Sequence, residues 1–460
     1  MTPVGRTRVE LRRSERIAVV ALLLVASLLV AHPAAAAPAA RCELPAAGEP
    51  FRTATPEQQD LDVTQLRRAV NQLSLRSRLS VRVFRNNCLV AQSALTPITD
   101  NVSNNLWSVT KSVTSLLTGI AIGDGKLSLD DPIGRYLPEG PSWGSPKHRA
   151  LTVRQLLTQS SGLDQAILAE ALTLGLDPSQ PRQALAQPFV HEPGTTFQYS
   201  QLNISLLGFV VQRAVGEDLQ EYAQRRLFGP IGIRDGSYFW LRDRSGLVYG
   251  YSNLFMKPKQ LARLALLMSN GGTWRGTRVV PADYVKAVSQ PSPTNGCYGF
   301  LFWTNRGTPC TGADIPSAQT VDHRMVPSAP VDTYEMNGTG GQLAIMVPSL
   351  GLTVVTTGYF GNIALNPQTL LGAGPSDEMQ YTFFRSLLKA FRDVDVPDPG
   401  PFRGDRLQLD LNPMNFLSPK VLLRSLLASP SCNVLVCDGT IPTQGLIRNV
   451  QALPGLAAAG

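Results

Sequence analysis

The segment Ser108-Val109-Thr110-Lys111 places a hydroxyl and an amine at a spacing that can do chemistry. Residues three apart share one face of a helix, so we expect the lysine amine within proton-transfer range of the serine hydroxyl. The following residues up to Ile122 are largely apolar, and burial among them would lower the pKa of Lys111 toward neutrality. Ser108 and Lys111 are therefore a candidate nucleophile and base, and the free N–H groups of a first helical turn would favour negative charge there.

The same four-residue pattern occurs again at Ser386-Leu387-Leu388-Lys389. It lies in a late amphipathic stretch with apolar residues from Met379 to Phe391, so we expect Lys389 to face solvent. The pattern alone therefore does not identify a site. For Ser108 and Lys111, the competing interpretation is a helix cap beside a lysine whose ammonium reaches water.

Strands and helices on both sides of this pair must position it. Alternating apolar residues at 79–83 predict a half-buried strand, and Asn86-Asn87 predicts a tight turn into a partner strand at 88–91. A helix is expected to begin at Thr64. Other helices are expected at 153–159, 206–214, 219–228, 258–268 and 281–289, other strands at 298–303, 342–347 and 352–357, and a last amphipathic helix from Ser376.

This order of elements predicts an α+β fold of the α/β-sandwich kind. One antiparallel sheet is flanked by helices, and a mostly helical lobe is inserted at about residues 131–295. From Asp395 onward the chain is rich in proline and is expected to be an irregular tail, closed by Cys432 and Cys437 and without chemistry of its own. We therefore divide the chain into a signal (1–37), a catalytic domain (38–395) and a tail (396–460).

The first 37 residues have the features of a secretory signal. Five arginines precede an apolar run at 17–31, and four alanines follow at 34–37. That run is too short to span a membrane comfortably as a permanent anchor. We therefore expect a secreted, extracytoplasmic protein with no stable membrane span in its mature part.

Composition indicates a globular protein with a sizeable core, since 43% of 460 residues are apolar. The formal charge is +8, and the signal holds five arginines and two glutamates, so +5 remains for the mature part. No cluster of lysines and arginines with interleaved aromatics stands out, which argues against nucleic acid as a partner. A weakly basic surface suits an acidic cell wall or membrane face.

Six cysteines in an exported protein suggest disulfides. Their positions along the chain suggest Cys42 with Cys88, Cys297 with Cys310 and Cys432 with Cys437, although six cysteines allow about 15 pairings. Neither C-x-x-C nor H-E-x-x-H spacing occurs, so the sequence predicts no metal and no other cofactor.

A serine and a lysine base need a third group to carry the proton to the leaving group, and a tyrosine can do this. Tyr199 follows Pro193-Gly194 and precedes an apolar helix, which places it on a loop leading into that helix. Tyr251-Ser252-Asn253 is a rival, but it lacks both the Pro-Gly dipeptide and the following Leu-Leu-Gly helix. Tyr199 is the preferred proton shuttle, and Tyr251 is expected to line the pocket or to be a buried tyrosine with a satisfied hydroxyl.

Several segments in this order resemble the class C β-lactamase and penicillin-binding-protein superfamily of serine hydrolases. The resemblance covers about residues 60–395 and rests on segments at 107–111, 125–132, 151–163 and 193–208. It implies a β-lactamase/transpeptidase-like fold, with Ser108 as the acylated nucleophile, Lys111 as the base or its electrostatic partner, and Tyr199 as the proton shuttle.

The third motif of that superfamily is a strand with Lys-Thr-Gly or a histidine variant, followed by glycines. The matching region here is 334–342, where Gly338, Thr339 and Gly340 keep the small residues but no lysine or histidine is present. A backbone N–H near Gly338 or Thr339, with that of Ser108, is expected to form an oxyanion hole. All three residues are expected to bind substrate.

Two departures from the superfamily bear on the substrate. Gln201 stands where asparagine is common, so the amide expected to hold the acyl-side carbonyl is one methylene longer. The missing cation of the third motif would otherwise bind a free carboxylate, as β-lactams and D-alanyl peptides carry. The glycine-rich segment at 338–342 and the segments at 270–274 and 298–300 resemble the esterase and oligomer-amidase branch instead.

Other catalytic interpretations have less support. Gly140-Pro141-Ser142-Trp143-Gly144 matches a nucleophile elbow, but it lacks the apolar strand before and the helix after that an elbow requires. His148, His191 and His323 lie in polar, turn-rich segments that are typical of surface histidines. The glycines at 338–341 do not open a helix, which argues against a dinucleotide site.

The sequence therefore predicts a secreted serine hydrolase that acts through an acyl-enzyme on an ester or amide substrate, small or peptide-like. One alternative is a D-alanyl carboxypeptidase or β-lactamase that recruits an arginine such as Arg324 for the carboxylate. The other, from a different class, is a non-catalytic cell-wall-binding protein that keeps the fold without turnover.

Overall fold

The structure is a computed structural model, and it describes residues 39–313, 319–359, 378–405, 412, 414, 417–427, 429 and 431–458. The predicted signal at 1–37 and the predicted helix start at Ser376 lie outside the described residues. The segment Arg41–Gly460 forms one compact unit.

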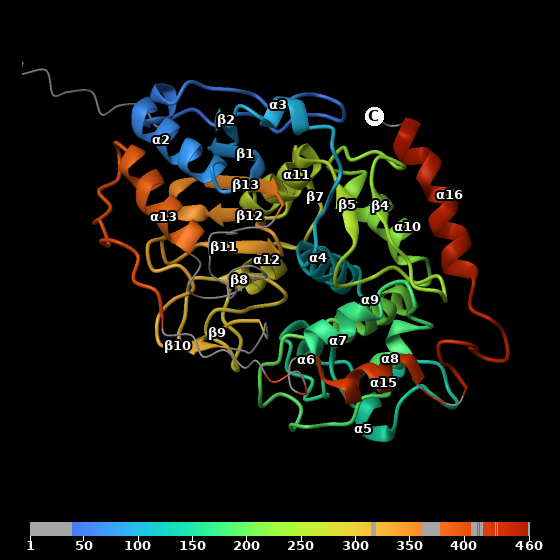
Figure 1. Cartoon of the computed structure of the whole chain (residues 1–460). Coiled ribbons are helices and arrows are strands. Elements are labelled where there is room, and N and C mark those ends of the chain that lie inside the picture. The colour runs from blue at the N-terminus through green and yellow to red at the C-terminus, as the bar shows by residue number, and fades with distance from the viewer. Residues whose placement is uncertain are drawn as a thin grey trace, which may run out of the picture. The chain divides into compact units, whose positions relative to one another are not determined.

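A six-stranded antiparallel sheet lies at the centre of this unit, in the order β2-β1-β13-β12-β11-β8 (Figure 1). Its strands are β1 (Arg78–Arg85), β2 (Cys88–Gln92), β8 (Trp303–Thr304), β11 (Tyr334–Gly338), β12 (Gln342–Val347) and β13 (Leu352–Gly358). β1 pairs with β13, so the sheet joins segments that lie far apart in the sequence. Every residue of β11, β12 and β13 is buried, as expected for strands covered on both faces.

Helices cover both faces of this sheet. On one side α2 (Val63–Ser74) and α13 (Glu378–Leu387) pack against each other, and on the other lie α4 (Val109–Gly123) and α11 (Pro258–Ser269) (Figure 1). α4 is buried on almost every side from Val109 to Ala121. Because α4 is enclosed in this way and contacts β11, its first turn is held beside the end of that strand.

The chain between α4 and α11 is mostly helical, as is the segment just after α11, and these segments are called the lobe. Its helices are α5 (Pro146–Arg149), α6 (Val153–Leu157), α7 (Ile167–Leu172), α8 (Gln180–Leu185), α9 (Leu202–Val215), α10 (Leu219–Ala223) and, after α11, α12 (Ala282–Val288). α10 continues as a π-helical turn, Gln224–Phe228. Gly216 ends α9 with a φ of 77°, which is a conformation that glycine adopts without strain.

Short elements complete the unit. They are α3 (Thr96–Thr99), the sheet of β3 (Asn104–Asn105), β5 (Leu254–Met256) and β4 (Phe239–Trp240), the pair β6 (Thr273–Trp274) and β7 (Thr277–Arg278), the pair β9 (Cys310–Thr311) and β10 (Thr320–Val321), and 3-10 turns at Glu57–Gln59, Ile133–Arg135, Pro348–Leu350 and Leu388–Ala390. The predicted α+β arrangement of an antiparallel sheet flanked by helices is confirmed. The three predicted disulfides are also confirmed: Cys42–Cys88, Cys297–Cys310 and Cys432–Cys437.

The prediction of an irregular tail is wrong. The tail contains α15 (Pro419–Leu427) and α16 (Gln444–Ala458), and α15 packs on α7 and α8 of the lobe. The prolines near residue 400 dominated the composition of the whole segment and hid two amphipathic stretches further on. α15 buries Val421 against Ala166 and Ala169 of the lobe. α16 contacts β4 and accepts a hydrogen bond from the backbone N–H of Arg242 through Asn449, so the tail belongs to the folded unit.

The predicted strand at 298–303 is also largely wrong, since only Trp303–Thr304 forms a strand. A Cβ at Gly299 would lie 2.3 Å from the backbone oxygen of Val288, and Leu301 has a φ of 59°. The chain therefore turns in this segment, and the aromatic residues that suggested a strand fill the core instead. In the part of the chain described here, no helix is both long and apolar enough to cross a bilayer.

Candidate active site

Ser108 lies immediately before the first residue of α4. Its hydroxyl makes no capping hydrogen bond to the helix, so the oxygen is left for other partners. The preceding residue, Trp107, has a φ of 47°, which turns the chain sharply into the helix. The half-buried Ser108 side chain is thus presented at a helix N-terminus, where free N–H groups and the helix dipole favour negative charge.

Lys111 is one turn further along α4 and is 1% exposed. Its Nζ lies 3.0 Å from Ser108 Oγ and 3.3 Å from the backbone oxygen of Tyr251, and it donates a short hydrogen bond to Gln201 Oε1. Burial lowers the pKa of Lys111 to about 7, and the Glu170 carboxylate opposes this decrease. An amine of that pKa exists partly uncharged near neutral pH, so it can accept a proton.

Tyr199 lies on the loop just before α9 and is buried. Its ring centroid is 4.7 Å from Lys111 Nζ, and the nearby Ser108 side chain opposes the rise of its pKa. The ring stacks on Trp303 with centroids 5.9 Å apart and meets Tyr298 edge-on at 6.0 Å. Burial raises the pKa of Tyr199, so its hydroxyl keeps its proton at neutral pH.

The rival tyrosine also lies beside Lys111, but in a different way. The ring centroid of Tyr251 is 5.4 Å from Lys111 Nζ, while its backbone oxygen accepts the hydrogen bond from that amine. Burial raises the pKa of Tyr251 well above its ordinary value, and the neighbouring Ser252 side chain opposes this rise. The two tyrosines therefore flank the amine, and Tyr199 is the one whose pKa is affected by the Ser108 side chain.

The glycine-rich segment after β11 lies against the start of α4. A Cβ at Gly338 would be 2.3 Å from the backbone oxygen of Leu106 and 3.2 Å from the backbone nitrogen of Val109. Only glycine allows the strand to approach so closely. Gly340 and Gly341 have φ values of 78° and 73°, and they turn the chain toward β12. The structure thus brings the backbone of Gly338 next to the residues on either side of Trp107 and Ser108.

Arg78 of β1 holds this turn through a hydrogen bond. Its Nη1 donates a 2.7 Å hydrogen bond to the backbone oxygen of Gly341, and its side chain is buried. The turn is therefore tied to the centre of the sheet, although no signal in the sequence connected Arg78 with the site.

A second residue that sequence reasoning missed is Glu170 of α7. It is 1% exposed, and its Oε2 accepts hydrogen bonds from the backbone N–H of Gln201 at 2.6 Å and of Leu202 at 3.0 Å. Burial raises its pKa to about 7, and the Lys111 ammonium is among the groups that oppose this rise. A single charge in the otherwise apolar run 166–172 was the signal that could have revealed it.

The competing motifs have structural explanations. Ser142 of the elbow-like segment lies in a turn, with a φ of 71°, and its hydroxyl contacts Ser429 and Ser431 of the tail. His148 Nε2 pairs with the backbone oxygen of Gln187, and His323 pairs with Asp405 at 3.0 Å. Across the described residues, no group of three or more His, Cys, Asp or Glu side chains could hold a metal ion.

Comparison with known proteins identifies the family. A model of the Beta-lactamase family matches residues 66–358, which is more than half of the chain. Esterase EstB of Burkholderia gladioli is 30% identical over 249 residues, which cover 51% of this chain and 63% of the esterase. Acyltransferase mokF of Monascus pilosus is 29% identical over 235 residues, covering 45% of this chain and 55% of that protein. The chain thus spans less than two thirds of the length of these relatives.

A crystal structure of a penicillin-binding-protein homologue from Caulobacter crescentus has the same fold. Its TM-score is 0.51 at 14% identity, over 72% of this chain and 98% of that one. This likeness concerns the fold alone, whereas the family match extends across the segments that carry Ser108, Lys111, Tyr199 and Gly338. The chain belongs to the Beta-lactamase family of serine hydrolases.

Proposed function

We propose that this chain is an exported hydrolase that forms an acyl-enzyme at Ser108 and acts on neutral esters or amides. The observation that carries the proposal is the 3.0 Å distance between Ser108 Oγ and the buried Nζ of Lys111. A serine hydroxyl is a weak nucleophile until a nearby base takes its proton, and a desolvated lysine is such a base.

The hydrogen bonds of Lys111 support this role. A neutral amine has two N–H groups and one lone pair, and two carbonyl oxygens, Gln201 Oε1 and the Tyr251 backbone oxygen, accept from Nζ. With both N–H groups donated to these acceptors, the lone pair faces Ser108 Oγ. The Ser108 proton then passes to Lys111 as the bond between Oγ and the substrate carbonyl carbon forms.

Tyr199 is the proposed proton relay to the leaving group. Its raised pKa keeps the hydroxyl protonated, so it can donate its proton to the departing oxygen or nitrogen while it receives one from Lys111. The carbon–oxygen or carbon–nitrogen bond of the substrate breaks in this step. Water then attacks the acyl-enzyme, and transfer in the reverse direction restores Ser108 and releases the acid.

The oxyanion of each tetrahedral intermediate needs donors that are already in position. We assign this role to the backbone N–H of Ser108 and to one at Gly338 or Thr339, which lie together because β11 ends against α4. Gly340 and the Gln201 amide complete the proposed contacts to substrate, and Tyr251 lines the pocket.

The proposed substrate is uncharged at the position where a β-lactam carries its carboxylate. β11 contains no lysine, arginine or histidine, and its Asn337 side chain is turned to Glu335 at 2.6 Å. The name of the esterase relative agrees with an ester substrate. Export is supported by the signal-like residues 1–37 and by three disulfides, which persist in oxidising compartments.

A fluorophosphonate probe and a substrate panel test this proposal. The probe should label the wild-type protein and Ser386→Ala, but not Ser108→Ala. In a panel of a short p-nitrophenyl ester, a D-amino-acid amide and a chromogenic β-lactam, the ester or amide should turn over fastest. Faster steady turnover of the β-lactam would favour the carboxypeptidase or β-lactamase alternative, and a correctly folded wild-type protein that is never labelled would favour a binding protein.

A further inference from the structure

The proposed mechanism gives Glu170 no role. Its buried carboxylate nevertheless accepts a hydrogen bond from the backbone of Gln201, whose side chain accepts one from Lys111. We propose that Glu170 is a positioning residue for Lys111, and that the tail helix α15 keeps it in place. This inference rests on the proposed function. Its geometric basis is a connected set of contacts that runs from the tail through α7 and Gln201 to the amine.

The connection from Glu170 to Lys111 passes through Gln201. Glu170 Oε2 accepts hydrogen bonds from the backbone N–H of Gln201 and of Leu202, and Oε1 accepts from Ala166 at 3.3 Å. These contacts fix the start of α9 and therefore the origin of the Gln201 side chain, whose Oε1 accepts from Lys111 Nζ. A displaced Gln201 would release one of the two acceptors that direct the Lys111 lone pair toward Ser108.

The tail holds α7 by apolar contacts and by an ion pair. Val421 of α15 is fully buried in a small cluster with Ala166 and Ala169. These two alanines come shortly before Glu170 in the sequence. Arg424 of α15 donates to Asp164 at 2.8 Å. α7 is only six residues long and cannot be stable by itself, so its position depends on what packs against it.

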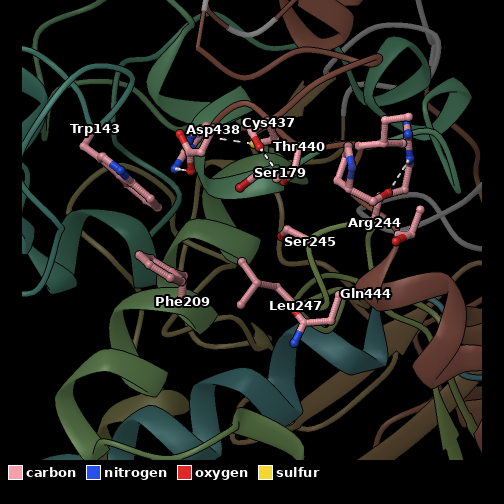
Figure 2. A pocket seen from close by; sticks show the side chains of 14 residues that line it. Trp143, Ser179, Phe209, Arg244, Ser245, Leu247, Cys437, Asp438, Thr440 and Gln444 are labelled. Carbon is pink, nitrogen blue, oxygen red and sulfur yellow. Dashed lines mark hydrogen bonds and ion pairs between the residues drawn. The ribbon is translucent and has the colours of Figure 1, made fainter.

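The rest of the tail is anchored independently to the same lobe. A cavity of about 500 Å³ lies between lobe and tail (Figure 2), with Trp143 and Phe209 from the lobe and Asp438 and Gln444 from the tail among its lining residues. Beside it, the Arg182 guanidinium donates two hydrogen bonds to the Asp438 carboxylate. The tail therefore has anchoring points on elements other than α7.

Charged and titratable groups around Lys111 come from several elements. Among the described residues, the charge of Glu170 of α7 affects the pKa of Lys111. The neutral Tyr199 and Tyr251 face the amine from two loops. Glu170 in turn faces Lys111 and Tyr251, while Arg424 of α15 pairs with Asp164 instead. A variant without the Glu170 carboxylate therefore tests how that charge affects the protonation of Lys111.

The expected direction follows from the sign of that charge. A nearby carboxylate favours the charged ammonium, so removal of the carboxylate charge lowers the pKa of Lys111. Because the reaction needs neutral Lys111, kcat/KM falls as the pH decreases through the pKa of this coupled pair. Without the carboxylate, the fall occurs at lower pH.

The first experiment compares Glu170→Gln with Asp243→Asn in full-length protein, using a p-nitrophenyl ester. Asp243 is the matched control, because it is a fully buried carboxylate of the same lobe that accepts backbone N–H bonds from Gln180 and Leu247, each at 3.0 Å. Glutamine keeps an oxygen for the start of α9. We expect the acidic limb of kcat/KM to move down by about 0.5 pH unit or more in Glu170→Gln and to stay in place in Asp243→Asn. An unmoved limb in Glu170→Gln, or an equal movement in both, would overturn the proposal.

The second experiment tests the tail without changing the buried carboxylate. Arg424→Gln removes the ion pair that joins α15 to the Asp164 side of α7, and Arg448→Gln removes a comparable 3.1 Å pair with Asp218. We expect kcat/KM to fall at least about threefold in Arg424→Gln and to stay within about twofold in Arg448→Gln. Equal effects of the two substitutions would contradict a specific role for α15, and this comparison remains available if Glu170→Gln does not fold.

Failure of this inference differs from failure of the proposed function. If Ser108→Ala abolishes labelling but Glu170→Gln keeps the wild-type limb, only the positioning role is lost. If wild-type protein is not labelled or labels without Ser108, the proposed function itself fails.

Discussion

Two segments of this chain share the pattern S-x-x-K and differ in everything around it. At the start of α4, Lys111 is 1% exposed and is held by Ser108, Gln201 and the Tyr251 backbone. In the 3-10 turn that follows α13, the side chain of Lys389 is 50% exposed and pairs with Asp398 at 3.0 Å. The difference shows that the four letters supply neither the desolvation of the amine nor the convergence of partners on it, and the proposed chemistry needs both.

The comparison is sharpest when each lysine is replaced by methionine, which has a similar length but no amine. Lys111→Met should lower kcat with a neutral ester by about 10²-fold to 10⁴-fold, because the proton acceptor is lost. Lys389→Met removes only an exposed ion pair and should change kcat by less than about twofold. Steady-state kinetics at saturating ester measures both effects.

The pH dependence of wild-type activity is a second test of the role of Lys111. Since burial lowers the pKa of Lys111 to about 7, activity should rise with pH through neutrality as the amine loses its proton. For the two substitutions, a comparable loss of activity in Lys111→Met and Lys389→Met would show that burial of Lys111 does not matter for catalysis.

Two neighbouring tyrosines allow a similar comparison within the site. Tyr199→Phe should lower kcat by about 10²-fold, because the ring and its stacking on Trp303 remain while the relay hydroxyl is removed. Tyr298→Phe changes a buried ring that packs on the same tryptophan, with centroids 4.8 Å apart, and should cost less than about fivefold. If Tyr298→Phe has the larger effect on kcat in single-turnover measurements, Tyr199 is not the relay.

Apart from the two control variants, Gln201→Asn gives the smallest expected effect on kcat in these comparisons. Asparagine is the residue common in the superfamily, but here its shorter side chain would lose the contact with Lys111 Nζ. We expect kcat to fall by about tenfold while labelling by the fluorophosphonate persists at a reduced rate. Wild-type kcat in this variant would show that the Tyr251 backbone oxygen alone orients the amine.

Much of the fold was predictable because its signals are local. The alternation in β1 and the apolar residues of α4 specify their structures within a few residues, and the resulting fold class and three disulfides are confirmed. The prediction failed at 298–303, where contact of Gly299 with Val288 forces a turn that no local pattern encodes.

The supporting residues of the site could not be predicted in the same way. Arg78, Glu170 and Val421 act through contacts with residues that lie far away in the sequence: Gly341, Gln201 and Ala166. Chemical type and spacing suggested which residues meet the substrate, since those positions follow a recurring pattern. The residues that hold them depend on tertiary packing, and only the folded chain shows which ones they are.

Identification of the acylated residue tests the central claim most directly. Wild-type protein should be mixed with a p-nitrophenyl ester, stopped with acid during turnover and digested for peptide mass spectrometry. We predict an acyl group on Ser108, and none on Ser386 or Ser142. An acyl group on a different residue, or turnover that continues undiminished in Ser108→Ala, would contradict the account.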